Sequence, residues 1–207
     1  MSSPAPCPRF RRIAVVGTTG SGKTTLASRL AQRLGIPHVE LDGLYWSPGW
    51  TPAEPEAFRE RTAQALSGAA WVTDGNYRQV RDIIWGRADT VVWLDYPLAV
   101  ILSRVVRRTV RRVVRREELW NQNREQLGTA FLSRDSIILW ALRTYRRRRR
   151  EYPVLLGMPE HAHLEVVHLH SPREARRWLA GLPSSPSPFQ GEGWGEGDTS
   201  PHPLVPA

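Results

Sequence analysis

One short segment of the sequence carries a clear chemical pattern: residues 17–24 read G-x-x-x-x-G-K-T. Glycines in such a loop let backbone N–H groups surround phosphate oxygens, and the start of a following helix adds partial positive charge. Lys23 can reach the β- and γ-phosphates of a nucleotide, and Thr24 offers a hydroxyl to Mg²⁺. The pattern predicts that ATP is bound by Gly17, Thr18, Thr19, Gly20, Ser21, Gly22, Lys23, Thr24 and Thr25.

Two aspartates, Asp42 and Asp74, follow apolar runs that we expect to be strands. Because the carboxyl ends of parallel strands meet at one edge of a sheet, both carboxylates should lie near the phosphate loop. In that position Asp42 can hold or deprotonate a phosphoryl acceptor. An ordinary Asp-Gly turn explains either residue without any chemistry.

The elements that must position these residues follow from the hydrophobic pattern. Short runs rich in β-branched residues predict five strands, at 13–16, 38–41, 71–73, 90–94 and 164–169. Helical periodicity predicts four helices, at 24–34, 55–66, 97–116 and 172–182. Since strands alternate with helices, we expect a three-layer α/β fold of the P-loop NTPase type, with a five-stranded parallel sheet in the order 2-3-1-4-5.

The 207-residue chain is long enough for one such domain, which we place at residues 9–182. Residues 1–8 and 183–207 lack periodicity and are rich in small residues and proline, so we expect both to be disordered. The single cysteine, Cys7, excludes an intrachain disulfide. With no secretion signal and no apolar run of the ~20 residues that a membrane helix needs, we expect a cytoplasmic protein.

The net charge of +9 comes from one segment. Residues 104–150 hold 15 arginines and 4 acidic residues, whereas the rest of the chain has 14 basic and 16 acidic residues. Because Lys23 is the only lysine, the Asn-Lys-x-Asp loop with which switch GTPases read guanine is excluded. Most of the arginines are expected to form a solvated helix face.

Four histidines surround the fifth expected strand, at positions His161, His163, His168 and His170. Their spacing raises the possibility of a metal site. In the sequence no cysteine or carboxylate completes a convincing set of ligands. We therefore predict no metal ligand among them.

Three further segments resemble nucleoside-monophosphate kinases, and more closely the adenylate-kinase-related family of DNA topology modulation proteins. They read LDGLYWSPGW at 41–50, WVTDGNYR at 71–78 and VWLDYP at 92–97. Together with the phosphate loop, the resemblance spans residues 13–182.

The resemblance implies roles for several residues. Asp74 would lie near Mg²⁺ through a water molecule, and Arg78 would bind an acceptor phosphate. Arg104 and Arg108 would begin an arginine-rich helical lid, at about 104–150, and would act in catalysis by neutralising the transferring phosphoryl group.

Other residues keep two interpretations. Trp46 and Trp50 could stack on a flat acceptor or could anchor their own loop by packing. Arg143 or Arg147 would supply the return side of the lid. Asp95 is expected to cap the fourth strand.

The leading function is ATP- and Mg²⁺-dependent phosphoryl transfer to a small acceptor, such as a nucleotide, a nucleoside or another hydroxyl metabolite. Lys23, Asp42, Arg104 and Arg108 would be the catalytic residues, and Asp42, Trp46 and Arg78 would bind the acceptor. The alternative is an ATP-dependent regulator that binds nucleic acid through residues 104–150. A membrane-surface helix ranks last. The sequence leaves open whether the protein is a monomer or a dimer.

Overall fold

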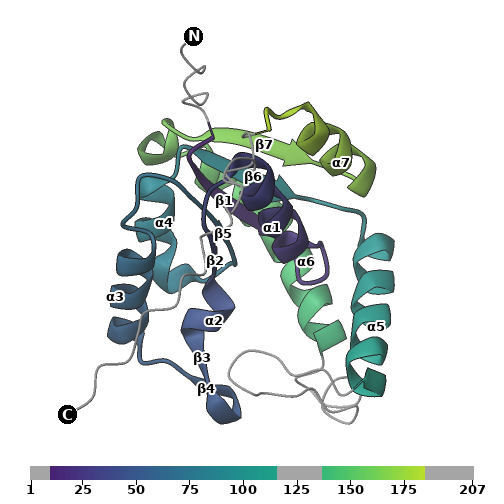
Figure 1. Ribbon diagram of the computed structural model, residues 1–207. Helices are drawn as coiled ribbons and strands as arrows, with labels where there is room; N and C mark the ends of the chain where they lie inside the picture. The colour runs from purple at the N-terminus through teal and green to yellow at the C-terminus, as the bar shows by residue number, and fades with distance from the viewer. Residues whose placement is uncertain (1–9, 116–136, 185–207) are drawn as a thin grey trace, which may run out of the picture.

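A computed structural model describes residues 10–115 and 137–184, and it shows a parallel β-sheet between two layers of helices (Figure 1). The sheet order is β2-β5-β1-β6-β7, and every neighbouring pair is parallel. This is the predicted order 2-3-1-4-5, so the predicted fold class is confirmed. The strands are β1 (Arg12–Gly17), β2 (His38–Glu40), β5 (Trp71–Asp74), β6 (Thr90–Leu94) and β7 (Glu165–Leu169).

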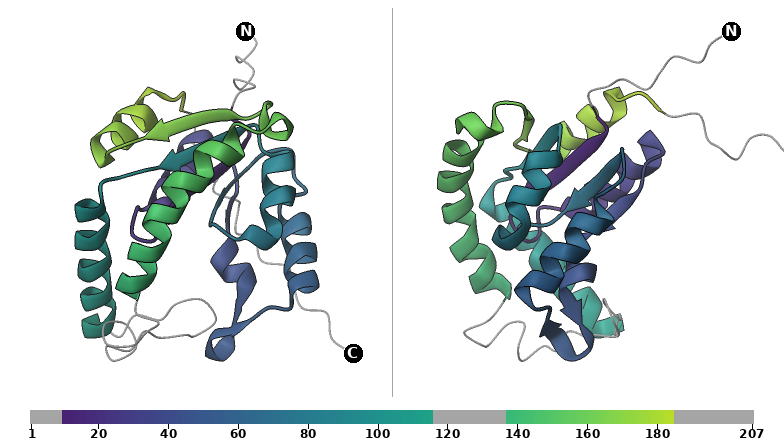
Figure 2. Two further views of the ribbon diagram at one scale, coloured as in Figure 1. Left: turned by 180° about the vertical axis from the view of Figure 1, so that it is seen from behind. Right: turned by 90° about the vertical axis from the view of Figure 1, so that its left-hand side faces the viewer.

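Helices pack on both faces of the sheet (Figure 2). One core is shared with residues of α1 (Lys23–Leu34), α5 (Leu98–Arg115) and α7 (Pro172–Gly181). The other is shared with α3 (Pro55–Ala65), α4 (Arg81–Arg87) and α6 (Ile137–Leu156).

Strand β1 shows why the apolar runs are continuous. Ile13 and Val15 belong to the first core, whereas Ala14 and Val16 belong to the second. Successive side chains of a strand point to opposite faces, so a strand that is covered on both sides is apolar at every position.

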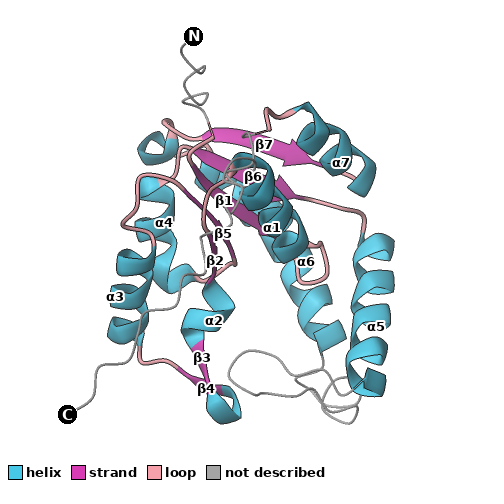
Figure 3. Ribbon diagram, viewed as in Figure 1, coloured by secondary structure: helices cyan, strands magenta, loops and turns pink. Residues whose placement is uncertain are grey.

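Most predicted element boundaries lie within one residue of the observed ones. The difference that matters is at 38–41, because Leu41 does not extend β2 but begins the short helix α2 (Leu41–Tyr45). A small antiparallel hairpin that the sequence did not predict follows, formed by β3 (Trp46–Ser47) and β4 (Thr51–Pro52). Figure 3 shows this hairpin below the sheet, next to α2.

Helices α2 and α4 were not predicted, and α6 was predicted only as part of the helical lid at about 104–150. Helix α6 contains the run of arginines at 146–150, most of which we expected to form a solvated face. That expectation is wrong for Arg148, which is 7% exposed. Thr144, Arg148 and Tyr152 are buried at a spacing of four residues, which is one face of a helix.

Some predicted regions cannot be compared with the structure. Residues 1–8, most of the tail at 183–207 and the part of the lid at 116–136 lie outside the described residues. In the ranges 10–115 and 137–184, no helix has the length and apolar character needed to cross a membrane.

Candidate active site

A pocket of about 1110 Å³ lies at the carboxyl edge of the sheet, where β1 and β5 end. Residues 19–25 line its centre, which we call the phosphate-loop end. A group of aromatic residues lines another part, which we call the aromatic end: Tyr45, Trp46, Trp50 and Tyr77. Gly17 and Thr18 are buried and are not among the lining residues, although they belong to the predicted loop.

The phosphate loop is a tight turn between β1 and α1. Gly20 and Gly22 have φ angles of 85° and 90°, a region that residues with a side chain rarely adopt. A Cβ atom on Gly20 would lie 2.5 Å from a methyl group of Val105, so α5 packs closely against the loop. The hydroxyl of Ser21 is buried without a hydrogen-bond partner among the described residues. A buried hydroxyl without a protein partner is consistent with a loop that binds a polar ligand.

Positive charge gathers around this loop. Burial, followed by the charge of Arg148, lowers the pKa of Lys23 to about 8. Arg104 donates a hydrogen bond of 2.8 Å to the carbonyl of Ser21. Arg148 donates one of 3.3 Å to the carbonyl of Gly17, and burial lowers the pKa of Arg148. Cations held this close together repel one another, and an anionic ligand would relieve that repulsion.

Oxygen atoms suited to Mg²⁺ lie beside the cations. The hydroxyl of Thr24 donates a hydrogen bond of 2.7 Å to the Oδ2 atom of Asp74. The other carboxylate oxygen, Oδ1, lies 2.9 Å from Nε2 of His38 on β2. A hydroxyl and a carboxylate are the oxygen donors that Mg²⁺ prefers. Nothing in the sequence singles out His38, because its contact with Asp74 depends on the pairing of β2 with β5.

An unexpected brace holds the start of the loop. The Asn76 side chain accepts from the N–H of Gly17 at 3.1 Å and donates to its carbonyl at 2.7 Å. Tyr152 on α6 donates to the same amide oxygen of Asn76 at 2.8 Å. Helix α6 therefore contacts Gly17 twice, directly through Arg148 and indirectly through Tyr152 and Asn76.

Asp42 lies at the aromatic end, on α2 and not at the end of a strand as predicted. The hydroxyl of Tyr77 donates a short hydrogen bond of 2.6 Å to Asp42. Burial and the charge of Asp42 raise the pKa of Tyr77, so its hydroxyl keeps its proton. The carboxylate is therefore oriented by Tyr77.

The rings of the aromatic end pack on one another. Tyr45 meets Trp46 edge-on at 4.8 Å between centroids and lies 4.6 Å from Tyr77. Trp46 and Trp50 are also edge-on, at 5.5 Å. The packing interpretation of Trp46 and Trp50 therefore agrees with the structure. Both rings also line the pocket, and their stacking on an acceptor stays a prediction.

The predicted arginines divide into two groups. Arg78, Arg104, Arg108 and Arg147 line the pocket. Arg143 is exposed and is not a lining residue, whereas Arg147 and Arg148 on α6 both line the pocket. Arg148 was missed because four other arginines surround it in the sequence; the signal was Tyr152, one helical turn further on.

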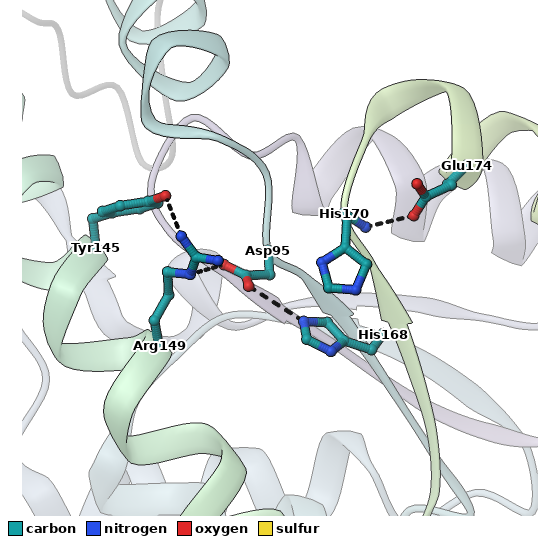
Figure 4. Close-up of polar contacts among 6 residues, drawn as sticks. All are labelled: Asp95, Tyr145, Arg149, His168, His170 and Glu174. Atoms are coloured by element: carbon teal, nitrogen blue, oxygen red, sulfur yellow. Dashed lines mark hydrogen bonds and ion pairs between the residues drawn. The ribbon is translucent and has the colours of Figure 1, made fainter.

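Asp95 does more than follow the fourth predicted strand. Its carboxylate is 7% exposed and lies within reach of His168, His170 and Arg149 (Figure 4). The prediction that no carboxylate accompanies these histidines is therefore wrong. The sequence alone does not predict this contact, because Asp95 is 73 residues away from His168. Asp95 directly follows β6, the strand that pairs with β7.

Comparisons with known proteins point to one group of enzymes. The shikimate kinase of Synechococcus elongatus is 30% identical over 139 residues, which are 57% of this chain and 73% of that protein. The shikimate kinase of Thermosynechococcus vestitus is 34% identical over 108 residues, 45% of this chain and 58% of that one. No protein-family model matches the chain.

Solved structures resemble the chain more distantly. Shikimate kinase from Acinetobacter baumannii, in complex with shikimate, gives a TM-score of 0.48 at 20% identity, over 83% of this chain and 89% of that one. A gluconokinase from Sinorhizobium meliloti gives 0.47 at 19%, over 83% and 93%. Likenesses at this level say nothing about which substrate this chain takes.

Proposed function

The chain belongs to the shikimate kinase family of P-loop kinases, and from this premise we propose that it transfers a phosphoryl group from ATP to a hydroxyl of a small acceptor held beside Asp42. One observation carries the proposal: the phosphate loop and Asp42 line the same pocket. A γ-phosphate bound at the loop and an acceptor hydroxyl beside Asp42 would therefore occupy the same pocket, with no protein segment between them.

At the phosphate-loop end, the residues present fit ATP and Mg²⁺. Backbone N–H groups of the loop and the ammonium of Lys23 would hold the β- and γ-phosphates. Thr24 would ligate Mg²⁺ directly and Asp74 through water, while His38 orients the Asp74 carboxylate. Mg²⁺, when bound, would neutralise part of the phosphate charge.

The rest of the nucleotide would lie toward α7. The pocket continues past the loop to Tyr96, Pro172 and Ala175, on the β6–β7 side of the sheet. Asp42 follows β2, at the opposite edge. This arrangement supports a nucleoside on one side of the loop and an acceptor on the other.

At the aromatic end, Asp42 would act as the general base. It would accept the proton of the acceptor hydroxyl while that oxygen bonds to the γ-phosphorus and the bond to the leaving ADP oxygen breaks. Tyr77 would keep the carboxylate in place, because its neutral hydroxyl donates to one oxygen and leaves the other for the substrate. Arg104, Arg108 and Arg148 would offset the charge of the transferring group.

The lining of the aromatic end bears on the acceptor. Four rings and the exposed Arg78 favour a flat or ring-shaped acceptor that carries negative charge. Nucleotides meet both conditions, in keeping with the resemblance to nucleoside-monophosphate kinases and DNA topology modulation proteins. Shikimate and gluconate, the acceptors suggested by the names of the relatives, belong in the same test.

The alternative of nucleic-acid binding gains no support. Arg104 and Arg148 both belong to the basic segment at 104–150. Their guanidinium groups donate to carbonyls of the phosphate loop, so they are directed into the pocket and not toward the outer surface of the protein. Their charge is thus explained by a small anionic ligand inside the pocket.

The test is ADP release from ATP and Mg²⁺ with a panel of acceptors: nucleoside monophosphates, nucleosides, shikimate, gluconate and DNA. We expect one small acceptor to stimulate release, and we expect Lys23→Met to abolish the stimulation. Stimulation by DNA alone, or none with any small acceptor, would contradict the proposal.

A further inference from the structure

A cluster outside the pocket brings together one carboxylate and two imidazoles. Asp95 follows β6, while His168 and His170 lie at the end of β7 (Figure 4). Each residue offers one ligand atom, and these atoms all lie within 4.8 Å of one another. The proposed phosphoryl transfer uses none of these three side chains.

The pairing of the strands creates the cluster. Leu94 is the register partner of Leu169, and the N–H of Asp95 donates to the Leu169 carbonyl at 2.9 Å. Asp95 therefore lies beside the end of β7. His168 and His170 are two residues apart in extended backbone, so their side chains point to the same side.

Contacts around the cluster hold its members in place. The ring of His168 stacks on Trp93, at 3.9 Å between centroids and 4° between planes. Arg149 binds Oδ1 of Asp95 at 3.0 Å and donates to the hydroxyl of Tyr145 at 2.8 Å. This leaves Oδ2 directed at Nε2 of His168, 3.3 Å away.

That distance fits a long hydrogen bond, and it equally fits two ligand atoms of one metal ion. N–H···O bonds cluster near ~2.9 Å. In a tetrahedral Zn²⁺ site with bonds of ~2.0 Å, neighbouring ligand atoms are ~3.3 Å apart.

We propose that Asp95, His168 and His170 form a binding site for a divalent transition-metal ion, with Zn²⁺ the best match. Two imidazoles and a carboxylate are typical Zn²⁺ ligands, whereas Mg²⁺ and Ca²⁺ prefer oxygen alone. The fourth position would be taken by water. Arg149 remains on the far oxygen of Asp95 as a positive neighbour, which weakens the site without blocking it.

The site would connect segments that shape the pocket. Tyr96, the residue after Asp95, lines the pocket. Pro172, two residues after His170, also lines the pocket. A bound ion would therefore join the β6–α5 and β7–α7 connections. Because only the folded chain brings the three ligands together, Zn²⁺ should raise the melting temperature.

The experiment is Zn²⁺ titration by calorimetry on the full chain, stripped with EDTA and held in excess Mg²⁺. We expect one Zn²⁺ per chain at micromolar affinity. His170→Gln, at an exposed position that should not disturb folding, should weaken binding at least ~10-fold. Arg149→Gln should strengthen it, because the guanidinium that repels the ion is gone.

The matched control is His163→Gln, an exposed histidine two residues before β7 whose Nε2 contacts the Trp85 carbonyl. It should leave the affinity unchanged. Wild-type affinity weaker than ~100 µM, or equal losses in His170→Gln and His163→Gln, would overturn the proposal. Co²⁺ provides a second measurement: the visible spectrum of tetrahedral Co²⁺ should appear in the wild type and be absent in His170→Gln.

Discussion

The two ends of the pocket are built in different ways. The phosphate-loop end is a run of consecutive residues whose backbone forms the binding surface, and its glycines are required by φ angles of 85° and 90°. The aromatic end is assembled from side chains of two separate segments, 42–50 and the segment that holds Tyr77, and Asp42 takes its orientation from Tyr77, 35 residues away. A site made of backbone tolerates few changes at all. A site made of side chains can change its ligand one residue at a time.

The largest effect is expected for Lys23→Met at the phosphate-loop end. Loss of the cation that we propose binds the β- and γ-phosphates should reduce kcat by at least ~10³-fold, because a charge aimed at the transferring group acts mainly in the transition state. Steady-state ADP release measures this. A reduction below tenfold would show that Arg104 and Arg148 suffice.

The same variant, which should lose activity, should be more stable than the wild type at neutral pH. Below pH 8 the buried ammonium is charged in both the folded and the unfolded chain, so the full cost of burying it is present. Between about pH 8 and 10.5 the unfolded chain binds more protons, so the free energy of unfolding of the wild type should rise with pH. Lys23→Met should therefore be more stable than the wild type at pH 7, and the advantage should shrink as the pH approaches 10.5. Urea unfolding without nucleotide, at several pH values, measures it; equal stability at pH 7 would refute the burial of the charge.

At the aromatic end, Asp42→Asn should lower kcat by about 10²-fold while ATP affinity stays the same. The amide cannot accept the proton of the acceptor, but it preserves the size of the side chain. The control is Asp82→Asn, since Asp82 is exposed and pairs with Arg59 outside the pocket. A matching loss of ATP affinity in Asp42→Asn would mean that the two ends do not work separately.

A smaller effect is expected for Tyr77→Phe, which removes the hydrogen bond to Asp42 and keeps the ring. Loss of one hydrogen bond to a charged group should lower kcat about tenfold. Steady-state kinetics with saturating ATP measures this. An unchanged kcat would show that Tyr77 serves only in packing.

The sequence predicted the elements and the loop far better than the contacts between them. Residues 13–16 and 91–94 are apolar at every position because both faces of the sheet are covered, and that pattern is local. The hydrogen bonds between Asn76 and Gly17 join residues 59 positions apart, and no local sequence pattern near either residue predicts them. Arg148 differs from its arginine neighbours only in its place on the buried face of α6.

The boundary of β2 shows the same limit on a smaller scale. Leu41 is apolar and continues the run 38–41, yet it starts α2, which moves Asp42 from a strand end onto a helix. Leu41 is buried in α2, as an apolar residue at the end of β2 would also be. Hydrophobicity alone therefore does not distinguish the helical from the strand conformation. The packing of Leu41 against Gly75, where a Cβ atom would lie 2.7 Å from a Leu41 methyl group, depends on the tertiary fold.

The most direct test of the account is transfer of labelled phosphate from γ-labelled ATP, with the acceptor that gives the strongest stimulation. The label should appear on the acceptor with the wild type and with Asp82→Asn, and its rate of appearance should fall about 10²-fold with Asp42→Asn. If the label were released only as inorganic phosphate, at a rate that Asp42→Asn leaves unchanged, the protein would be an ATPase and the acceptor site beside Asp42 would be wrong.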